Sequence, residues 1–153
     1  MSFRKVDLLL ADYACVTPDG KLTVVGAGWT VTGPGPAPSA VGVIIEVDWT
    51  ATNTRHHAVL SLSDQDGRPV FDQRGEPIQV TADFETGRPA GLPEGTGMNF
   101  PFAVNLGFLP LIPGNRYVWE LTIDGEHRGD WSLPFLVRPA PLEGADGPPG
   151  APA

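Results

Sequence analysis

The chain has 153 residues and a formal net charge of −8, with ten Lys and Arg residues spread among eighteen Asp and Glu residues. Because surfaces that bind nucleic acids or anionic membranes need clustered basic side chains, this balance argues against both as partners. The length is that of one ordinary domain, and 19 Gly with 17 Pro fit many short strands joined by turns.

The N-terminal region bears on the cellular compartment. Cys15 is the single cysteine, so no internal disulfide can form, which favours a reducing environment. Asp7 and Asp12 interrupt the apolar run that a signal peptide would need. No run approaches the ~18 apolar residues of a membrane-spanning helix. We therefore expect a cytoplasmic protein that does not bind membranes.

The first predicted strand, residues 4–14, has a helical alternative. Val6, Leu9 and Tyr13 also fit one stripe of a helix. Residues 18–20 read Pro-Asp-Gly, a turn signal, and a second predicted strand, residues 21–31, follows it directly. A hairpin needs a first strand, so we expect a strand over residues 4–14.

Alternation of apolar and polar residues continues along the chain and predicts strands with one face on a core. The further predicted strands are residues 41–50, 56–64, 77–86, 98–109, 116–124 and 129–138. Their apolar faces comprise Val41, Val43, Ile45, Val47 and Trp49; Ile78, Val80, Ala82 and Phe84; Met98, Phe100, Phe102, Val104, Leu106 and Phe108; Tyr117, Trp119, Leu121 and Ile123; and Trp131, Leu133, Phe135 and Val137. About eight strands with turns between them predict an all-β fold, a single-domain antiparallel two-sheet β-sandwich of immunoglobulin-like or jelly-roll type.

Two long loops and a tail interrupt this pattern. Residues 33–39 read Gly-Pro-Gly-Pro-Ala-Pro-Ser and predict a stiff connector. Residues 86–97 show no periodicity, and a loop of that length is either functional or disordered. Residues 140–153 lack β-branched and aromatic side chains, so we expect a disordered tail after a domain that covers residues 1–139.

Cys15, His56 and His57 are candidates for nucleophilic or metal chemistry. A reactive cysteine needs a neighbouring base, and the nearest histidines lie two predicted strands later. Adjacent strand residues point to opposite faces, so His56 and His57 cannot bind one metal ion together, and His127 is distant in the sequence. We interpret Cys15 as a small apolar strand residue and the histidines as structural.

Acidic residues and glycines offer three further patterns. Residues 64–67, Asp-Gln-Asp-Gly, resemble the start of a calcium loop, but Arg68 stands where that loop needs an oxygen ligand. Asp83 and Glu85 share one strand face, whereas paired catalytic carboxylates face each other across a cleft. Residues 26–28, Gly-Ala-Gly, lack the helix of a phosphate loop. The sequence thus predicts no catalytic residue, no metal ligand and no cofactor.

Four residues are candidates for contact with a partner. Trp29 lies beside the Gly-Pro connector, and an aromatic side chain next to a loop can anchor another protein. Arg88, Leu92 and Glu94 belong to the loop over residues 86–97.

Two motifs carry a resemblance to a known family. D-Y-A…D-G-K-L-x-x-x-G-A-G-W runs from Asp12 to Trp29, and P-G-x-x-Y-x-x-x-L-x-x-D-G-E runs from Pro113 to Glu126. With these motifs the chain, up to about Pro139, resembles a family of small uncharacterised bacterial proteins that is common in actinobacteria and described as a domain of unknown function. The resemblance implies a stand-alone β-sandwich without an assigned activity, and it supplies no catalytic or binding residues.

Together these patterns predict a non-enzymatic protein-interaction or structural module, whose partner is another protein or a second copy of the chain. The alternative is a small-molecule binder or cryptic enzyme with its site in a cleft between the sheets. Convergent polar groups inside an apolar pocket would support that alternative. A third hypothesis is self-assembly through exposed sheet edges.

Overall fold

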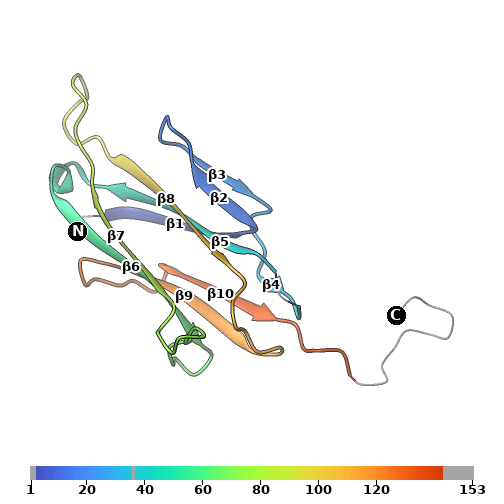
Figure 1. Ribbon diagram of the computed structural model, residues 1–153. Helices are drawn as coiled ribbons and strands as arrows, with labels where there is room; N and C mark the ends of the chain where they lie inside the picture. The colour runs from blue at the N-terminus through green and yellow to red at the C-terminus, as the bar shows by residue number, and fades with distance from the viewer. Residues whose placement is uncertain (1–2, 36, 143–153) are drawn as a thin grey trace.

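The computed structural model describes residues 3–35 and 37–142 (Figure 1). Within these residues the chain forms ten strands and one short 3-10 helix, and no helix is long and apolar enough to cross a membrane. The elements are β1 (Phe3–Ala11), β2 (Tyr13–Val16), β3 (Leu22–Val25), β4 (Val31–Thr32), β5 (Ser39–Val47), η1 (Trp49–Ala51), β6 (Arg55–Asp64), β7 (Gln79–Glu85), β8 (Met98–Gly107), β9 (Arg116–Ile123) and β10 (Ser132–Val137).

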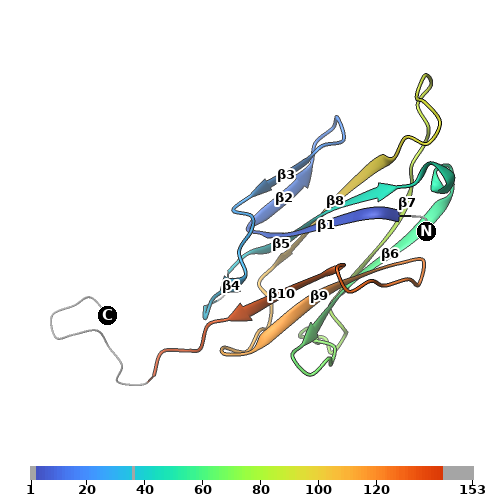
Figure 2. The same cartoon turned by 180° about the vertical axis from the view of Figure 1, so that it is seen from behind.

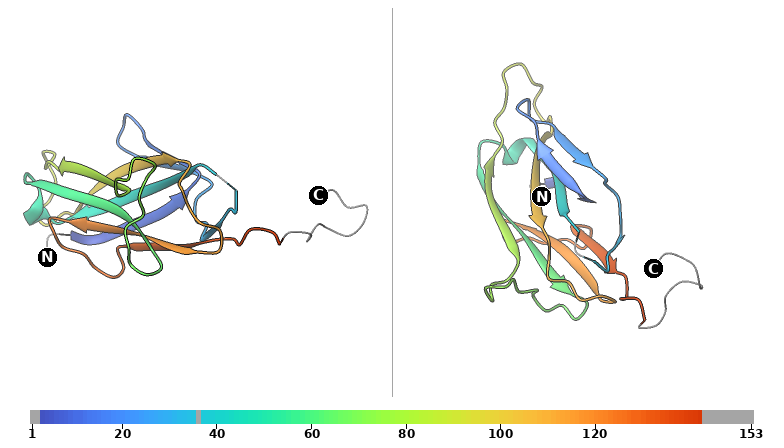
Figure 3. Two further views of the ribbon diagram at one scale, coloured as in Figure 1. Left: turned by 60° about the horizontal axis from the view of Figure 1, so that its bottom comes forward. Right: turned by 45° about the vertical axis from the view of Figure 1, so that its right-hand side comes forward.

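Two sheets face each other and enclose the core, and a hairpin lies outside them (Figures 1 and 3). The three-stranded sheet has the order β1-β5-β8, and the five-stranded sheet has the order β4-β10-β9-β6-β7. Strands β2 and β3 pair only with each other. The all-β sandwich is therefore confirmed, with every pairing antiparallel except the short parallel contact of β4 with β10.

The strand count differs from the expected eight because two predicted strands are each divided. The chain from residue 4 to 14 breaks at Asp12 into β1 and β2, and the chain from 21 to 31 forms β3 and β4 with an irregular stretch between them. The region over residues 4–14 is strand and not helix. The domain boundary stays a prediction: residues 140–142 hold no strand, and the rest of the expected tail lies outside the described residues.

The core lies between the inner faces of β5 and β9. The residues at alternate positions of these strands are at most 4% exposed, which confirms the predicted phases: Val41, Val43, Ile45 and Val47 in β5, and Tyr117, Trp119, Leu121 and Ile123 in β9. The same core includes Phe135 and Val137 of β10, the strand that pairs with β9, and Trp131 just before β10. Packing of this kind stabilises a sandwich because each strand contributes one continuous apolar face.

Two predicted core residues lie elsewhere. Trp49 is not on a strand, because β5 ends at Val47 and the chain enters η1; its ring is half-buried under the guanidinium of Arg88, 4.3 Å from the ring centroid. Phe108 is 69% exposed, because β8 ends at Gly107, where a φ of +61° turns the chain away from the strand direction. Period-two alternation in the sequence does not mark either strand end.

The hairpin β2–β3 covers the outer face of the three-stranded sheet (Figures 1 and 2). A Cβ at Gly42 of β5 would lie only 3.1 Å from side-chain atoms of Leu22 and of Val24, so the hairpin packs directly on that glycine. The side chain of Asn105 in β8 makes two hydrogen bonds to the hairpin. Its Nδ2 donates to the Ala14 carbonyl at 2.7 Å, and its Oδ1 accepts from the Ala14 N–H at 3.1 Å. The opening motif is thus a hairpin with its turn at residues 18–20, as predicted.

Candidate functional site

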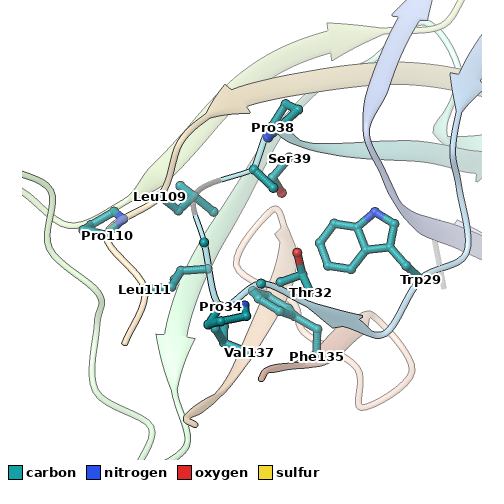
Figure 4. A pocket seen from close by; sticks show the side chains of 13 residues that line it. Trp29, Thr32, Pro34, Pro38, Ser39, Leu109, Pro110, Leu111, Phe135 and Val137 are labelled. Atoms are coloured by element: carbon teal, nitrogen blue, oxygen red, sulfur yellow. The ribbon is translucent and has the colours of Figure 1, made fainter. Parts of the chain in front are cut away.

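A cavity of about 170 Å³ lies at one end of the sandwich, between the two sheets (Figure 4). Four segments of the chain meet there: β4 with its flanking residues and the connector, the start of β5, the segment that follows β8, and the end of β10. Strand β4 pairs with the last residues of β10. The Gly-Pro connector therefore begins at this end of the sandwich, and the chain then enters β5 at Ser39. The residues that line the cavity are Trp29, Thr32, Gly33, Pro34, Gly35, Ala37, Pro38, Ser39, Leu109, Pro110, Leu111, Phe135 and Val137.

The lining side chains are mostly apolar, and polar backbone groups share the surface with them. The rings of Trp29 and Phe135 meet edge to face, with centroids 5.8 Å apart and planes at 87°. Phe135 in turn stacks on Tyr117, also at 5.8 Å, so the inner wall is continuous with the core. No charged side chain is among the described residues that line the cavity. A ligand inside would therefore meet hydrocarbon and aromatic side chains together with neutral polar groups, and no ionic partner.

Polar atoms without partners lie in these apolar walls. Ser39 is 6% exposed, and its Oγ has no hydrogen-bond partner within the described part of the chain. The hydroxyls of Ser39 and Thr32 both point into the cavity (Figure 4). The buried Nε1 of Trp29 likewise has no partner among the described residues. A buried hydroxyl that is left unpaired costs about 1–3 kcal/mol, and a bound molecule that pairs with it recovers part of that cost, because its own polar group loses its hydration.

The four predicted contact residues fall at two separate places. Trp29 lines the cavity, beside the start of β5. The loop over residues 86–97 joins β7 to β8 at the opposite end, because Val47 pairs with Met98 while Ser39 pairs with Gly107. Trp29 and the loop therefore do not form one contact surface.

Within the loop, the three candidates Arg88, Leu92 and Glu94 differ in their contacts and exposure. Arg88 packs on Trp49 and donates hydrogen bonds to the Thr52 hydroxyl and to the Trp49 carbonyl. Leu92 is half-buried, and Glu94 is exposed. The base of the loop is thus fixed to η1 through Arg88.

The two adjacent histidines point to opposite faces, as predicted. His56 is buried, with Nδ1 2.7 Å from Asp124 Oδ2 and Nε2 2.7 Å from the Ala51 carbonyl oxygen. His57 is on the outer face, with Nδ1 2.6 Å from Asp83 Oδ1. The sequence did not indicate that Asp124 contacts the His56 ring and the His57 N–H, because in the sequence Asp124 is only a turn residue.

The contacts of the two carboxylates shift their pKa values. Desolvation raises the pKa of Asp124, but hydrogen bonds from the His57 N–H and from the His56 ring, with the charges of both histidines, outweigh it and hold the pKa below its ordinary value. The hydrogen bond from His57, together with the charges of His57 and Arg55, lowers the pKa of Asp83 in the same way, against a smaller effect of desolvation. Both carboxylates are therefore held in the ionised form by the fold.

The remaining candidates lie at separate places in the fold. Cys15 is a free, half-buried thiol in β2. Asp64 Oδ1 accepts from the N–H groups of Asp66 and Arg68, both at 2.9 Å, so it closes a turn. A Cβ at Gly26 would lie 2.3 Å from an Asp12 carboxylate oxygen, which explains the glycine at this corner. Among residues 3–35 and 37–142, no group of three or more His, Cys, Asp or Glu side chains is placed to hold a metal ion.

Sequence reasoning did not find the cavity, because its lining comes from segments far apart in the chain. The available signals were the connector over residues 33–39 and the apolar run over residues 108–112, but only the fold brings them together.

The sequence analysis also missed the turn over residues 72–75. Asp72 Oδ1 accepts from Arg74 and Glu76 in the same way that Asp64 closes its turn, and the sequence repeats Asp-Gln-x-Gly at both places.

Comparisons with known proteins leave the activity open. No curated protein and no solved structure matches the chain significantly. One family model matches residues 7–138, which spans every strand from β2 to β10 and the greater part of β1. The chain belongs to DUF6941, a family of unknown function.

Proposed function

We propose that this domain is a non-enzymatic binding module whose end cavity takes a small uncharged ligand. The observation that supports this most directly is the Ser39 hydroxyl, which is 6% exposed, has no partner among the described residues and points into an apolar cavity. Convergent polar groups in an otherwise apolar concave site are the usual form of a small-molecule site.

The cavity proposal is tested by filling the cavity. Leu111→Trp adds an indole at the wall, and Ile112→Trp adds the same group one residue later, where the side chain is 61% exposed. We expect neutral molecules of about six to eight non-hydrogen atoms, which suit a cavity of this size, to shift backbone amide NMR signals of the cavity residues. The shifts should disappear in Leu111→Trp and persist in Ile112→Trp, with both variants giving folded spectra. Failure of the whole panel to bind at millimolar concentration would reject the cavity as a ligand site.

A second candidate function is recognition of another protein, or of a second copy of the chain, through residues 86–97. It is favoured by the way this loop extends beyond the sheets with its base fixed by Arg88 (Figure 1). Such an arrangement presents residues such as Glu94 at a defined position while leaving them exposed.

Replacing residues 90–95 with a Gly-Ser segment of equal length tests this second candidate, because Arg88 and its contacts are kept. The matched control replaces the exposed residues of the turn at 72–75 in the same way. We expect a partner captured by the wild-type protein, or a dimer measured by light scattering, to be lost only from the loop variant. Equal binding by both variants would assign the contact to another surface.

A further inference from the structure

The cavity also indicates what kind of molecule it takes, and this inference rests on the proposed function. We infer that its ligand is a neutral, single-ring compound that carries one hydroxyl group, a small phenol or cyclic alcohol. Three properties of the site lead to this class: its charge, its size and the placement of its hydroxyls.

Charge excludes the ionic ligands. The described lining residues include no Lys, Arg, His, Asp or Glu. Transfer of an ionised carboxylate or ammonium group into such surroundings is strongly unfavourable without a paired charge. The overall charge of −8 adds a repulsive field for anions. A carboxylate-bearing ring is therefore a poor ligand even where the ring itself fits.

The volume of the cavity suits a ligand with one ring. An apolar cavity of about 150 Å³ holds a benzene molecule, and the cavity here, which opens to solvent along residues 34–35 and 37–38, measures about 170 Å³. The edge-to-face pair of Trp29 and Phe135 provides aromatic surface on one side. Pro34, Pro38 and Leu111 provide aliphatic surface around the rest. A ring with one additional oxygen atom matches both the volume and this lining.

The hydroxyls select an oxygen function that both donates and accepts. Ser39 and Thr32 come from opposite sheets, the first from the start of β5 and the second from β4, and both hydroxyls point into the space between them (Figure 4). A ligand hydroxyl can accept from one of them and donate to the other, whereas a carbonyl oxygen can only accept and pairs with both only when both of them donate. Pairing also removes the unsatisfied state of Ser39 Oγ, which an apolar ring would leave unchanged.

Titration of three probes separates this inference from the proposed function. Benzene, phenol and benzoate have the same ring and differ in the polar group, and binding of each is followed by NMR in wild type, Ser39→Ala and Thr32→Val. The control is Ser132→Ala, a half-buried serine of β10 outside the cavity lining.

We expect phenol to bind wild type about tenfold more tightly than benzene, since one buried hydrogen bond separates them. Ser39→Ala should remove this preference and leave benzene affinity unchanged, which also shows that the variant keeps its cavity. Thr32→Val should reduce the preference, Ser132→Ala should keep it, and benzoate should bind most weakly. Equal affinities of benzene and phenol in wild type, or tighter binding of benzoate, would overturn the inference while leaving a ligand cavity in place. If none of the probes bound, the proposed function itself would fail.

Discussion

Trp119→Ala should lower the free energy of unfolding by about 3–5 kcal/mol, the usual cost of removing a large aromatic side chain from a core. Trp119 is fully buried, and β9 holds it between Leu62 of β6 and Leu133 of β10. The neighbouring sheets cannot close over the space that the indole leaves, so the loss includes a cavity in the centre of the sandwich. Urea denaturation followed by circular dichroism measures the change.

Thr122→Ala is the matched control for Trp119. It lies on the same strand, three residues later, on the half-buried outer face. We expect it to change the free energy of unfolding by less than about 1 kcal/mol, as surface substitutions usually do. Equal effects of the two substitutions, or an unchanged midpoint for Trp119→Ala, would mean that the assigned faces of β9 are wrong.

Asp124→Asn should cost about 1–3 kcal/mol, because it removes a charged acceptor from the buried His56 ring. The Asp124 carboxylate serves two partners: Oδ2 lies 2.7 Å from His56 Nδ1, and Oδ1 accepts from the His57 N–H at 2.9 Å. An asparagine side chain has one acceptor oxygen and cannot serve both. Asn also tolerates the positive φ of +52° at this position, so the change tests the charge and not the turn.

The effect of Asp124→Asn should depend on pH with a defined sign. The pKa of Asp124 is lowered from its ordinary value of 3.8 in the folded protein. Its stabilising contribution is therefore fully present above that value and is lost as the pH falls through the lower, folded-state pKa. We expect the difference in unfolding free energy between wild type and variant to be large at pH 7 and to shrink below about pH 4. Asp130→Asn, an exposed control, should show no such difference at any pH.

Local patterns account for the parts of the fold that could be predicted. The inner faces of β5 and β9 and the opposite orientation of His56 and His57 all follow from the period of two in a strand. The turn at residues 18–20 follows from residues that accept turn conformations. These features depend on neighbours a few positions apart, and the sequence records such neighbours directly.

Long-range packing accounts for the predictions that failed. Trp49 and Phe108 continue the alternation of their strands, yet both lie beyond the point where pairing stops. Gly42 reads as an outward-facing strand residue, and only the hairpin that lies across it explains the absence of a side chain. The position of a strand end, and of a hairpin that packs on a sheet, depends on which strands become neighbours. A local pattern in the sequence does not predict these neighbours.

The sequence by itself determined the fold class, the phases of the strands and the histidine orientations, since each follows from backbone geometry over a few residues. The tertiary structure decided the site. Pairing of β4 with β10 and of β5 with β8 brings Trp29, Ser39 and Leu109 to one end of the sandwich, and it sends the loop over residues 86–97 to the other. The buried, unpaired hydroxyl of Ser39 exists only after these segments, from distant parts of the chain, have closed around it.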